Sequence, residues 1–83
     1  NDADEDNERM FERIISRAFK KLKPDSQTVL NLFNEGCTYE EIAQRMNLKN
    51  ETYARRKKYL SKEALMEIVA KDPEYQEYLR YKK

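Results

Sequence analysis

Residues that interrupt helices are scarce in this chain, and this scarcity constrains the fold more than any other feature. The sequence has one glycine and two prolines among 83 residues, and 40% of its residues are charged. Helix interiors accept most charged residues readily but accept glycine and proline poorly. Pro24 and Pro73 suit the first turn of a helix, and Gly36 suits the position after a helix end. The sequence therefore predicts an all-α fold, a small bundle of four to five helices.

Apolar periodicity locates the outer helices of this bundle. From Glu8 onward, apolar residues recur at three- and four-residue spacing, which predicts a first helix with one buried face. The residues of that face are Met10, Phe11, Ile14, Ile15, Ala18, Phe19 and Leu22. A second helix should follow Pro24, and Asp72 with Pro73 should start a short last helix.

The first eight residues lack this periodicity. Residues 1–12 carry a net charge of −5, and residues 1–8 contain a single alanine as their only apolar residue. Such a segment cannot bury enough apolar surface to order itself. We expect residues 1–8 to be an acidic, disordered tail or the end of a linker from a longer protein, and residues 9–83 to form one domain.

Residues 38–58 contain the signals of two helices joined by a tight turn. Thr38 and Glu41 have the spacing of a capping box, which predicts a helix over residues 39–46. Asn47 follows, and asparagine tolerates the left-handed conformation that ends such a helix. Asn50 suits the N-cap of a second helix. This spacing is that of a helix-turn-helix, whose second helix enters the major groove of DNA.

The second helix of this motif should continue to about residue 70. Its large apolar residues, Tyr53 and Leu60, recur on one side with Ala64 and Ile68, so we expect that side to face the domain. Side chains on the opposite side would then be available to base edges. These candidates are Asn50, Glu51, Ala54, Arg55 and Lys58.

Each candidate has a chemistry that suits a base. Arg55 can form a bidentate pair with guanine O6 and N7, and Asn50 can form one with adenine N6 and N7. Glu51 can accept a hydrogen bond from cytosine N4, and Ala54 can only touch a thymine methyl group.

Cations beside these positions are candidates for phosphate contact, which fixes register without reading sequence. Residues 49–62 carry a net charge of +5, so DNA would meet a strongly positive helix. The phosphate candidates on this segment are Lys49, Arg56, Lys57 and Lys62. Thr38 and Tyr39, at the start of the first helix of the motif, could also meet a phosphate. Capping explains Thr38 equally well, and packing against the preceding helix explains Tyr39 equally well.

The run from Leu22 to Leu65 resembles region 4, the promoter-binding domain of sigma-70-family RNA polymerase sigma factors, and in particular the extracytoplasmic-function type. The matching residues are Leu22, Pro24, Val29, Leu30, Leu32, Glu35, Gly36, Tyr39 to Ala43, Met46 to Leu48, Leu60 and Leu65. Two positions depart from the family pattern: Asn47 stands where glycine is usual, and Tyr53 stands where an aliphatic residue is usual.

The resemblance implies a function and partners. It implies binding to the upstream, −35-type promoter element of double-stranded DNA. It also implies contact with core RNA polymerase through the flap of its β subunit, and with an anti-sigma protein. The helices over residues 10–33 would be the place to look for polymerase contacts. Independently of the resemblance, a single cysteine allows no internal disulfide, so we expect a cytoplasmic location.

The composition argues against several other functions. The chain has no histidine and one cysteine, Cys37, so it lacks the residues for a His/Cys metal site or a cysteine–histidine nucleophile. It has no apolar stretch of the roughly 20 residues that span a bilayer. We therefore expect no enzymatic activity, no cofactor, no small-molecule substrate and no membrane insertion.

Two alternatives remain from the sequence. The DNA-binding domain of a response-regulator-like transcription factor has a similar helix-turn-helix, but such domains usually bind paired half-sites as dimers. A helical protein-interaction module is the second alternative, since helical bundles host many functions. A palindromic site would select the first, and loss of all DNA binding at low salt would select the second.

Overall fold

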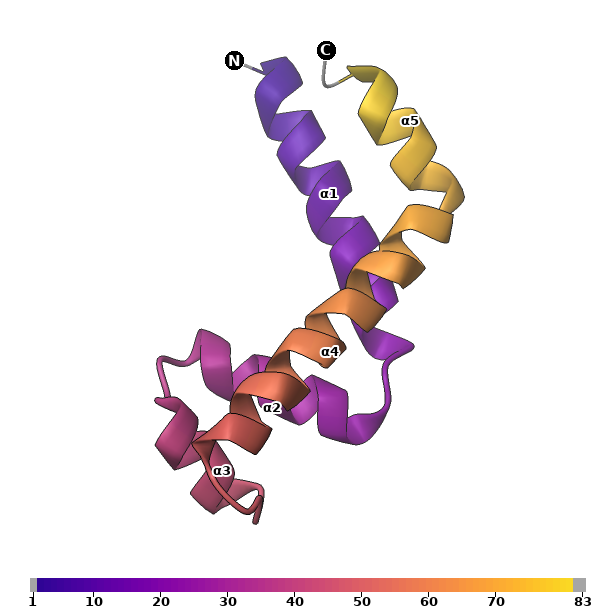
Figure 1. The fold of residues 1–83 in the computed structure, drawn as a ribbon. Helices are drawn as coiled ribbons and strands as arrows, with labels where there is room; N and C mark the ends of the chain where they lie inside the picture. Colours follow the sequence, from indigo (N-terminus) through magenta and orange to yellow (C-terminus); the bar gives the residue numbers. More distant parts are fainter. Residues whose placement is uncertain (1, 82–83) are drawn as a thin grey trace. The chain divides into compact units, whose positions relative to one another are not determined.

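The computed structural model describes residues 2–81, and within them the chain is helical with no strand. The helices are α1 (Asp2–Lys20), α2 (Pro24–Asn34), α3 (Tyr39–Arg45), α4 (Glu51–Lys71) and α5 (Pro73–Tyr81), in the order shown in Figure 1. The predicted all-α class with a helix-turn-helix is thus confirmed. The chain divides into two compact units, one of residues 1–21 with 65–83 and one of residues 22–64.

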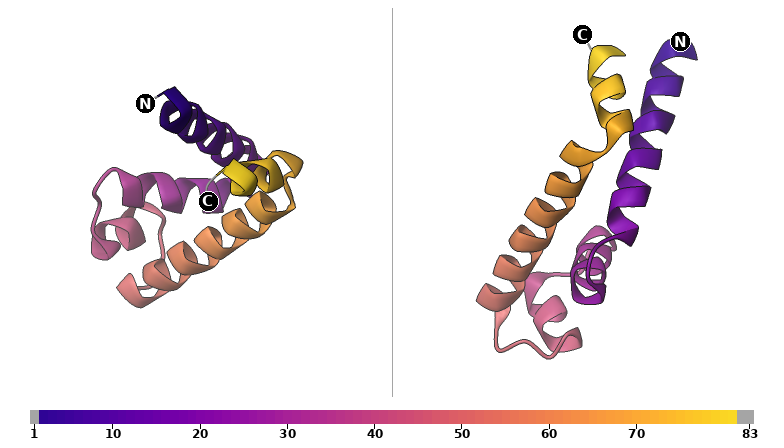
Figure 2. Two further views of the ribbon diagram at one scale, coloured as in Figure 1. Left: turned by 90° about the horizontal axis from the view of Figure 1, so that it is seen from above. Right: turned by 90° about the vertical axis from the view of Figure 1, so that its right-hand side faces the viewer.

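The first unit contains α1, the end of α4 and α5, and α1 and α5 lie side by side in it (Figure 2). Its centre is made of Ile14, Ala18 and Val69, which are buried. Around this centre lie partly buried apolar side chains, namely Met10, Ile15, Leu65, Ile68, Tyr75 and Tyr78. The apolar face predicted for the first helix therefore does face a core.

The start of α5 is as predicted. The backbone N–H of Glu74 donates to Oδ1 of Asp72 at 2.8 Å, so Asp72 caps the helix that Pro73 begins. Arg17 of α1 donates to both Asp72 and Glu74, and Arg13 donates to Glu74 at 2.7 Å. These polar contacts join α1 to the first turn of α5.

The acidic segment differs from the sequence expectation. Helix α1 begins at Asp2, so residues 2–7 are helical rather than a disordered tail, and the helix starts earlier than Glu8. Asp6, Asn7 and Met10 line a groove with Glu77 and Tyr81, so α5 provides a neighbour that periodicity could not reveal. The role of this segment as the end of a linker stays a prediction.

The second unit contains α2, α3 and the first part of α4. Its buried apolar residues are Leu22, Val29, Leu30, Ile42, Ala43 and Ala54. The two chain reversals that flank α3 adopt left-handed backbone, at Gly36 with φ 93° and at Asn47 with φ 58°. Glycine and asparagine are among the residues that accept this conformation most readily. Both positions match the sequence prediction.

The described residues contain neither a membrane-spanning helix nor a metal-binding cluster of side chains. No helix there has the length and apolar character to cross a membrane. Within the same residues, no cluster of three or more histidine, cysteine, aspartate or glutamate side chains is arranged to hold a metal ion.

Candidate nucleic-acid interface

A complete capping box begins α3. The backbone N–H of Glu41 donates to Oγ1 of Thr38 at 3.1 Å, and the backbone N–H of Thr38 donates to Oε1 of Glu41 at 2.9 Å. These hydrogen bonds lower the pKa of the Glu41 carboxyl below its ordinary value. The bond from the Thr38 backbone has the larger effect, and the bond with the Thr38 side chain has the smaller one. The predicted helix start is therefore confirmed. The Thr38 hydroxyl oxygen is occupied by this cap, as the capping interpretation required.

The turn after α3 is short and tightly bonded. The backbone N–H of Leu48 donates to the carbonyl oxygen of Ala43 at 2.7 Å, and Asn47 takes the left-handed conformation just before it. A hydrogen bond that spans the end of a helix in this way satisfies one of its terminal carbonyls. Leu48 is half-buried, as expected of the turn's inward residue.

Asn50 caps the start of α4 with its side chain. Its Oδ1 accepts from the backbone N–H of Thr52 at 3.0 Å and from that of Tyr53 at 3.2 Å. The predicted N-cap is thus confirmed. The cap has a consequence for DNA reading, because bidentate pairing with adenine needs the same oxygen to accept from N6. Asn50 can make that pair only by giving up the cap, so its amide nitrogen is the group left to approach a base.

The inward face of α4 is the predicted one at Ile68, which packs against the core of the first unit, but not at Tyr53 and Leu60. Ala54 is 0% exposed and Ser61 is 3% exposed, whereas Tyr53 is 50% exposed and Leu60 is 54% exposed. In this part of α4 the true inward face is therefore rotated by one residue from the predicted face. Small side chains let α4 approach its neighbours closely, and a tyrosine or leucine at those positions would hold it further away.

This rotation removes one candidate base reader. A fully buried Ala54 methyl group cannot touch a thymine methyl, so the assignment of Ala54 to the base-reading set is wrong. Thr52, in the first turn of α4, is exposed, and the sequence did not identify it as a candidate for base reading. The seven-residue spacing of the small residues Ala54 and Ser61 was the signal that could have identified this face.

The cations of α4 fall into two groups. Lys49, just before the helix, and Arg55, Arg56 and Lys62 on it are exposed, and so is the carboxylate residue Glu51. Lys57 and Lys58 are half-buried. Nζ of Lys57 lies 3.6 Å from Oδ2 of Asp25 in α2, an ion pair whose aspartate is 76% exposed. A pair so open to solvent contributes little to stability and leaves Lys57 available to a stronger anion.

Two of the cations lie against aromatic rings. The guanidinium carbon of Arg55 is 4.7 Å from the centroid of the Tyr39 ring, and Nζ of Lys58 is 4.2 Å from the centroid of the Phe33 ring. The two rings stack with their centroids 5.8 Å apart. Tyr39 is half-buried in this arrangement, as its packing interpretation required.

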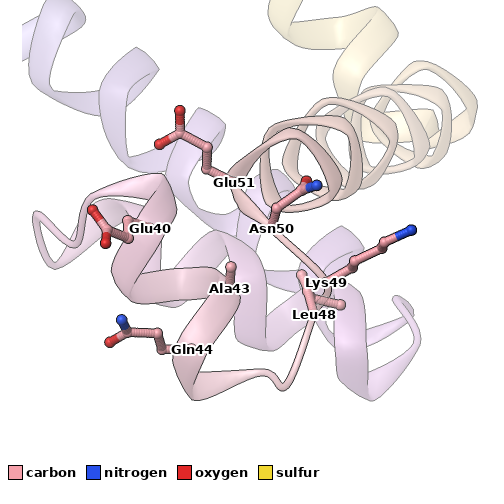
Figure 3. A pocket seen from close by; sticks show the side chains of 7 residues that line it. All are labelled: Glu40, Ala43, Gln44, Leu48, Lys49, Asn50 and Glu51. Atoms are coloured by element: carbon pink, nitrogen blue, oxygen red, sulfur yellow. The ribbon is translucent and has the colours of Figure 1, made fainter.

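An open groove of 460 Å³ lies between α3 and the start of α4 (Figure 3). Polar side chains from both helices surround it, and the turn contributes Leu48 and Lys49. The residues that line it are Glu40, Ala43, Gln44, Leu48, Lys49, Asn50 and Glu51. Lys49, Asn50 and Glu51 thus lie at one edge of the helix-turn-helix. Beside them in the groove are the carboxylate of Glu40 and the amide of Gln44, both from α3.

Comparison with known proteins agrees with this geometry. The family model described as Sigma-70, region 4 matches residues 12–58, which is more than half of the chain. The matched residues include α2, α3, the turn and the basic first turns of α4. No curated protein sequence and no solved structure matches the chain. The family is a DNA-binding regulatory one rather than a catalytic one, and its match decides between the two helix-turn-helix interpretations of the sequence. This chain belongs to the sigma-70 region 4 family, the DNA-binding domains through which sigma factors recognise promoters.

Proposed function

We propose that this chain binds the upstream, −35-type element of promoter DNA as part of a sigma factor that directs RNA polymerase to start sites. The observation that carries the proposal is the exposed, cationic side of α4 immediately after a capped turn, with Arg55 and Arg56 both open to solvent. A helix in this position of a helix-turn-helix has its N-terminal residues at base edges in the major groove.

Base reading is assigned to the exposed side chains of the first turns of α4. Arg55 pairs with guanine O6 and N7, and Glu51 accepts from cytosine N4. Thr52 joins them, since its exposed hydroxyl can bond to any base edge. Lys58 is half-buried and reaches DNA only through its ammonium group, and Asn50 acts through its amide nitrogen.

Phosphate contact is assigned to the remaining cations. Lys49, Arg56 and Lys62 are exposed, and Lys57 has only a weak ion pair to exchange for a phosphate. Thr38 and Tyr39 complete the set at the start of α3. Each phosphate neutralised releases counterions, so affinity should fall steeply as salt rises.

The protein links promoter DNA to core RNA polymerase, because it binds DNA with one surface and the polymerase with another. The flap of the polymerase β subunit is the proposed polymerase contact, and an anti-sigma protein is the proposed competitor. These partners place the chain in the cytoplasm. Affinity of the separate domain for DNA should be modest, because binding gains strength when the polymerase is held at the same site.

The test compares two neighbouring arginines with the same side chain. Binding selection from randomised duplexes at low salt should give one preferred site for the unaltered chain. Arg55→Ala should cost about 1 to 3 kcal/mol on that site and abolish the preference at one base pair. Arg56→Ala should weaken binding to all sequences alike and reduce the salt slope by about 1.

The control is Arg80→Ala, which removes an equal charge from an exposed position of α5. It should leave the selected site and the affinity as they are. A selection profile with no preferred site for the unaltered chain would reject promoter reading. A profile that Arg55→Ala leaves unchanged would reject the assignment of Arg55 alone.

A further inference from the structure

Four side chains from three helices form a continuous contact series in the unit of residues 22–64. Lys58 of α4 lies over Phe33 of α2, Phe33 stacks on Tyr39 of α3, and Arg55 of α4 lies over Tyr39. Neither aromatic residue belongs to the buried apolar set of this unit, and Phe33 is 39% exposed. The ring pair therefore lies outside the buried core, and Arg55, one of the two cations in contact with it, is exposed.

We propose that Tyr39, backed by Phe33, is a positioning residue that determines how strictly Arg55 selects its base. This inference rests on the proposed promoter-binding function and extends it to residues outside α4. Tyr39 does not itself read the base. Its ring holds the guanidinium of Arg55 in a defined place before DNA arrives.

The chemistry of arginine allows stacking and base reading at the same time. A guanidinium interacts with an aromatic ring through its flat face, and it hydrogen-bonds to guanine through its N–H edge. A guanidinium that stacks on the Tyr39 ring through its face keeps its N–H edge available to O6 and N7. An unsupported arginine on a helix surface would lose more rotamer freedom when it orders against a base. Restricting it beforehand favours the bidentate geometry, and bidentate geometry is what distinguishes guanine from other bases.

Packing alone does not account for the arrangement. The stacking of Phe33 on Tyr39, with their ring centroids 5.8 Å apart, would be enough to join α2 to α3. Joining them would not need two cations from α4 at 4.7 and 4.2 Å from those rings. Both of these cations belong to the side chains assigned to base reading.

The experiment compares Tyr39→Leu with Tyr39→Phe in the full chain. Both substitutions remove the hydroxyl that a phosphate could bond, but only the phenylalanine keeps the ring. Tyr39→Phe should retain the preference at the base pair read by Arg55. Tyr39→Leu should reduce that preference by about two- to fivefold, the range expected for a cation–π contact at an exposed site. Binding selection and direct titration of duplexes that differ at that base pair provide the measurement.

A second substitution separates positioning from structure. In an Arg55→Ala background, Tyr39→Leu should have no further effect on base preference, because the residue that Tyr39 positions is gone. A purely structural role of the ring would make Tyr39→Leu bind all sequences more weakly than Tyr39→Phe, which lacks the same hydroxyl, and it would do so in both backgrounds. That outcome would overturn the proposal.

A readout without DNA keeps the proposal testable if Tyr39→Leu does not fold. The side-chain protons of Arg55 should show a ring-current shift in the NMR spectrum of the unaltered chain and of Tyr39→Phe. Absence of that shift in the unaltered chain would overturn the proposal. A chain with no base preference at all would overturn the proposed function together with this inference. A chain with a clear preference that Tyr39→Leu leaves intact would overturn this inference only.

Discussion

Arg17 holds the carboxylate of Asp72 with two hydrogen bonds, from Nε to Oδ2 at 3.1 Å and from Nη2 to Oδ1 at 3.0 Å. Oδ1 also accepts the backbone N–H of Glu74 at 2.8 Å, so a single side chain caps α5 and binds α1. The Asp72 side chain is 8% exposed, whereas that of Arg17 is 45% exposed. The geometry of the pair is that of a fork and a carboxylate, the strongest form of such contacts.

Replacement of Asp72 should separate its two roles. Asp72→Ala removes both the cap and the ion pair, and loss of the cap alone should lower the free energy of unfolding by about 1 kcal/mol. Asp72→Asn keeps an oxygen for the cap and removes the charge. Asp72→Asn should lower stability less than Asp72→Ala, since the Arg17 side chain of the ion pair is exposed to solvent. Urea denaturation followed by circular dichroism measures both. Equal losses for the two variants would show that the charge, and not the cap, is what matters.

Acid should destabilise the protein through Glu74. Hydrogen bonds from Arg13, which has the largest effect, and from Arg17 lower the pKa of the Glu74 carboxyl below its ordinary value of 4.5. A carboxyl whose pKa is lower in the folded state stabilises that state above pH 4.5, and this contribution disappears as the pH falls through the folded pKa. The melting temperature should therefore fall as the pH drops below 4.5, and fall less steeply in Glu74→Gln. Glu77→Gln, the same change at an exposed position of α5, is the control. Parallel pH profiles for the unaltered chain and Glu74→Gln would contradict the prediction.

The rotated face of α4 can be tested by two substitutions of opposite kind. Ala54→Leu adds volume at a position that is 0% exposed, and overpacking of this sort should cost about 1 to 3 kcal/mol of stability. Leu60→Ala removes volume at a position that is 54% exposed, and it should change stability by less than about 0.5 kcal/mol. Chemical denaturation of both variants is the measurement. The reverse ranking would mean that Leu60 faces the core, as the sequence suggested.

Asn50 should stabilise the start of α4 through the two hydrogen bonds that its side-chain oxygen accepts. Asn50→Ala removes the acceptor for the N–H groups of Thr52 and Tyr53, which should lower stability by about 1 kcal/mol and speed hydrogen exchange at those two amides. Asn50→Asp keeps the acceptor and should preserve both amides' protection. Native-state hydrogen exchange measured by NMR tests this residue by residue. Unchanged exchange at Thr52 and Tyr53 in Asn50→Ala would show that the cap is not formed in solution.

Much of the site was predictable because its signals are local. The capping box pairs Thr38 with a residue three positions away, and the left-handed backbone at Asn47 reflects a preference of that residue type. The Asn50 cap likewise involves N–H groups two and three residues on. These interactions form within one helical turn, so their residue types and spacing are sufficient to identify them.

The face of α4 was not predictable in the same way. Hydrophobicity favoured Tyr53 and Leu60 as inward residues, but close contact between helices favours the smaller Ala54 and Ser61. How near two helices come depends on every side chain between them, and a helical pattern on one of them does not contain that information.

The sequence by itself determined the helical class, the starts of α2 to α5 and the basic character of α4, because each depends on the residue types present or on interactions between near neighbours. Only the tertiary structure decided that Arg55 lies over Tyr39, that Ala54 is buried and that the acidic residues 2–7 are helical. The reason is that these facts depend on which helices become neighbours, and Arg55 and Tyr39 come from different helices.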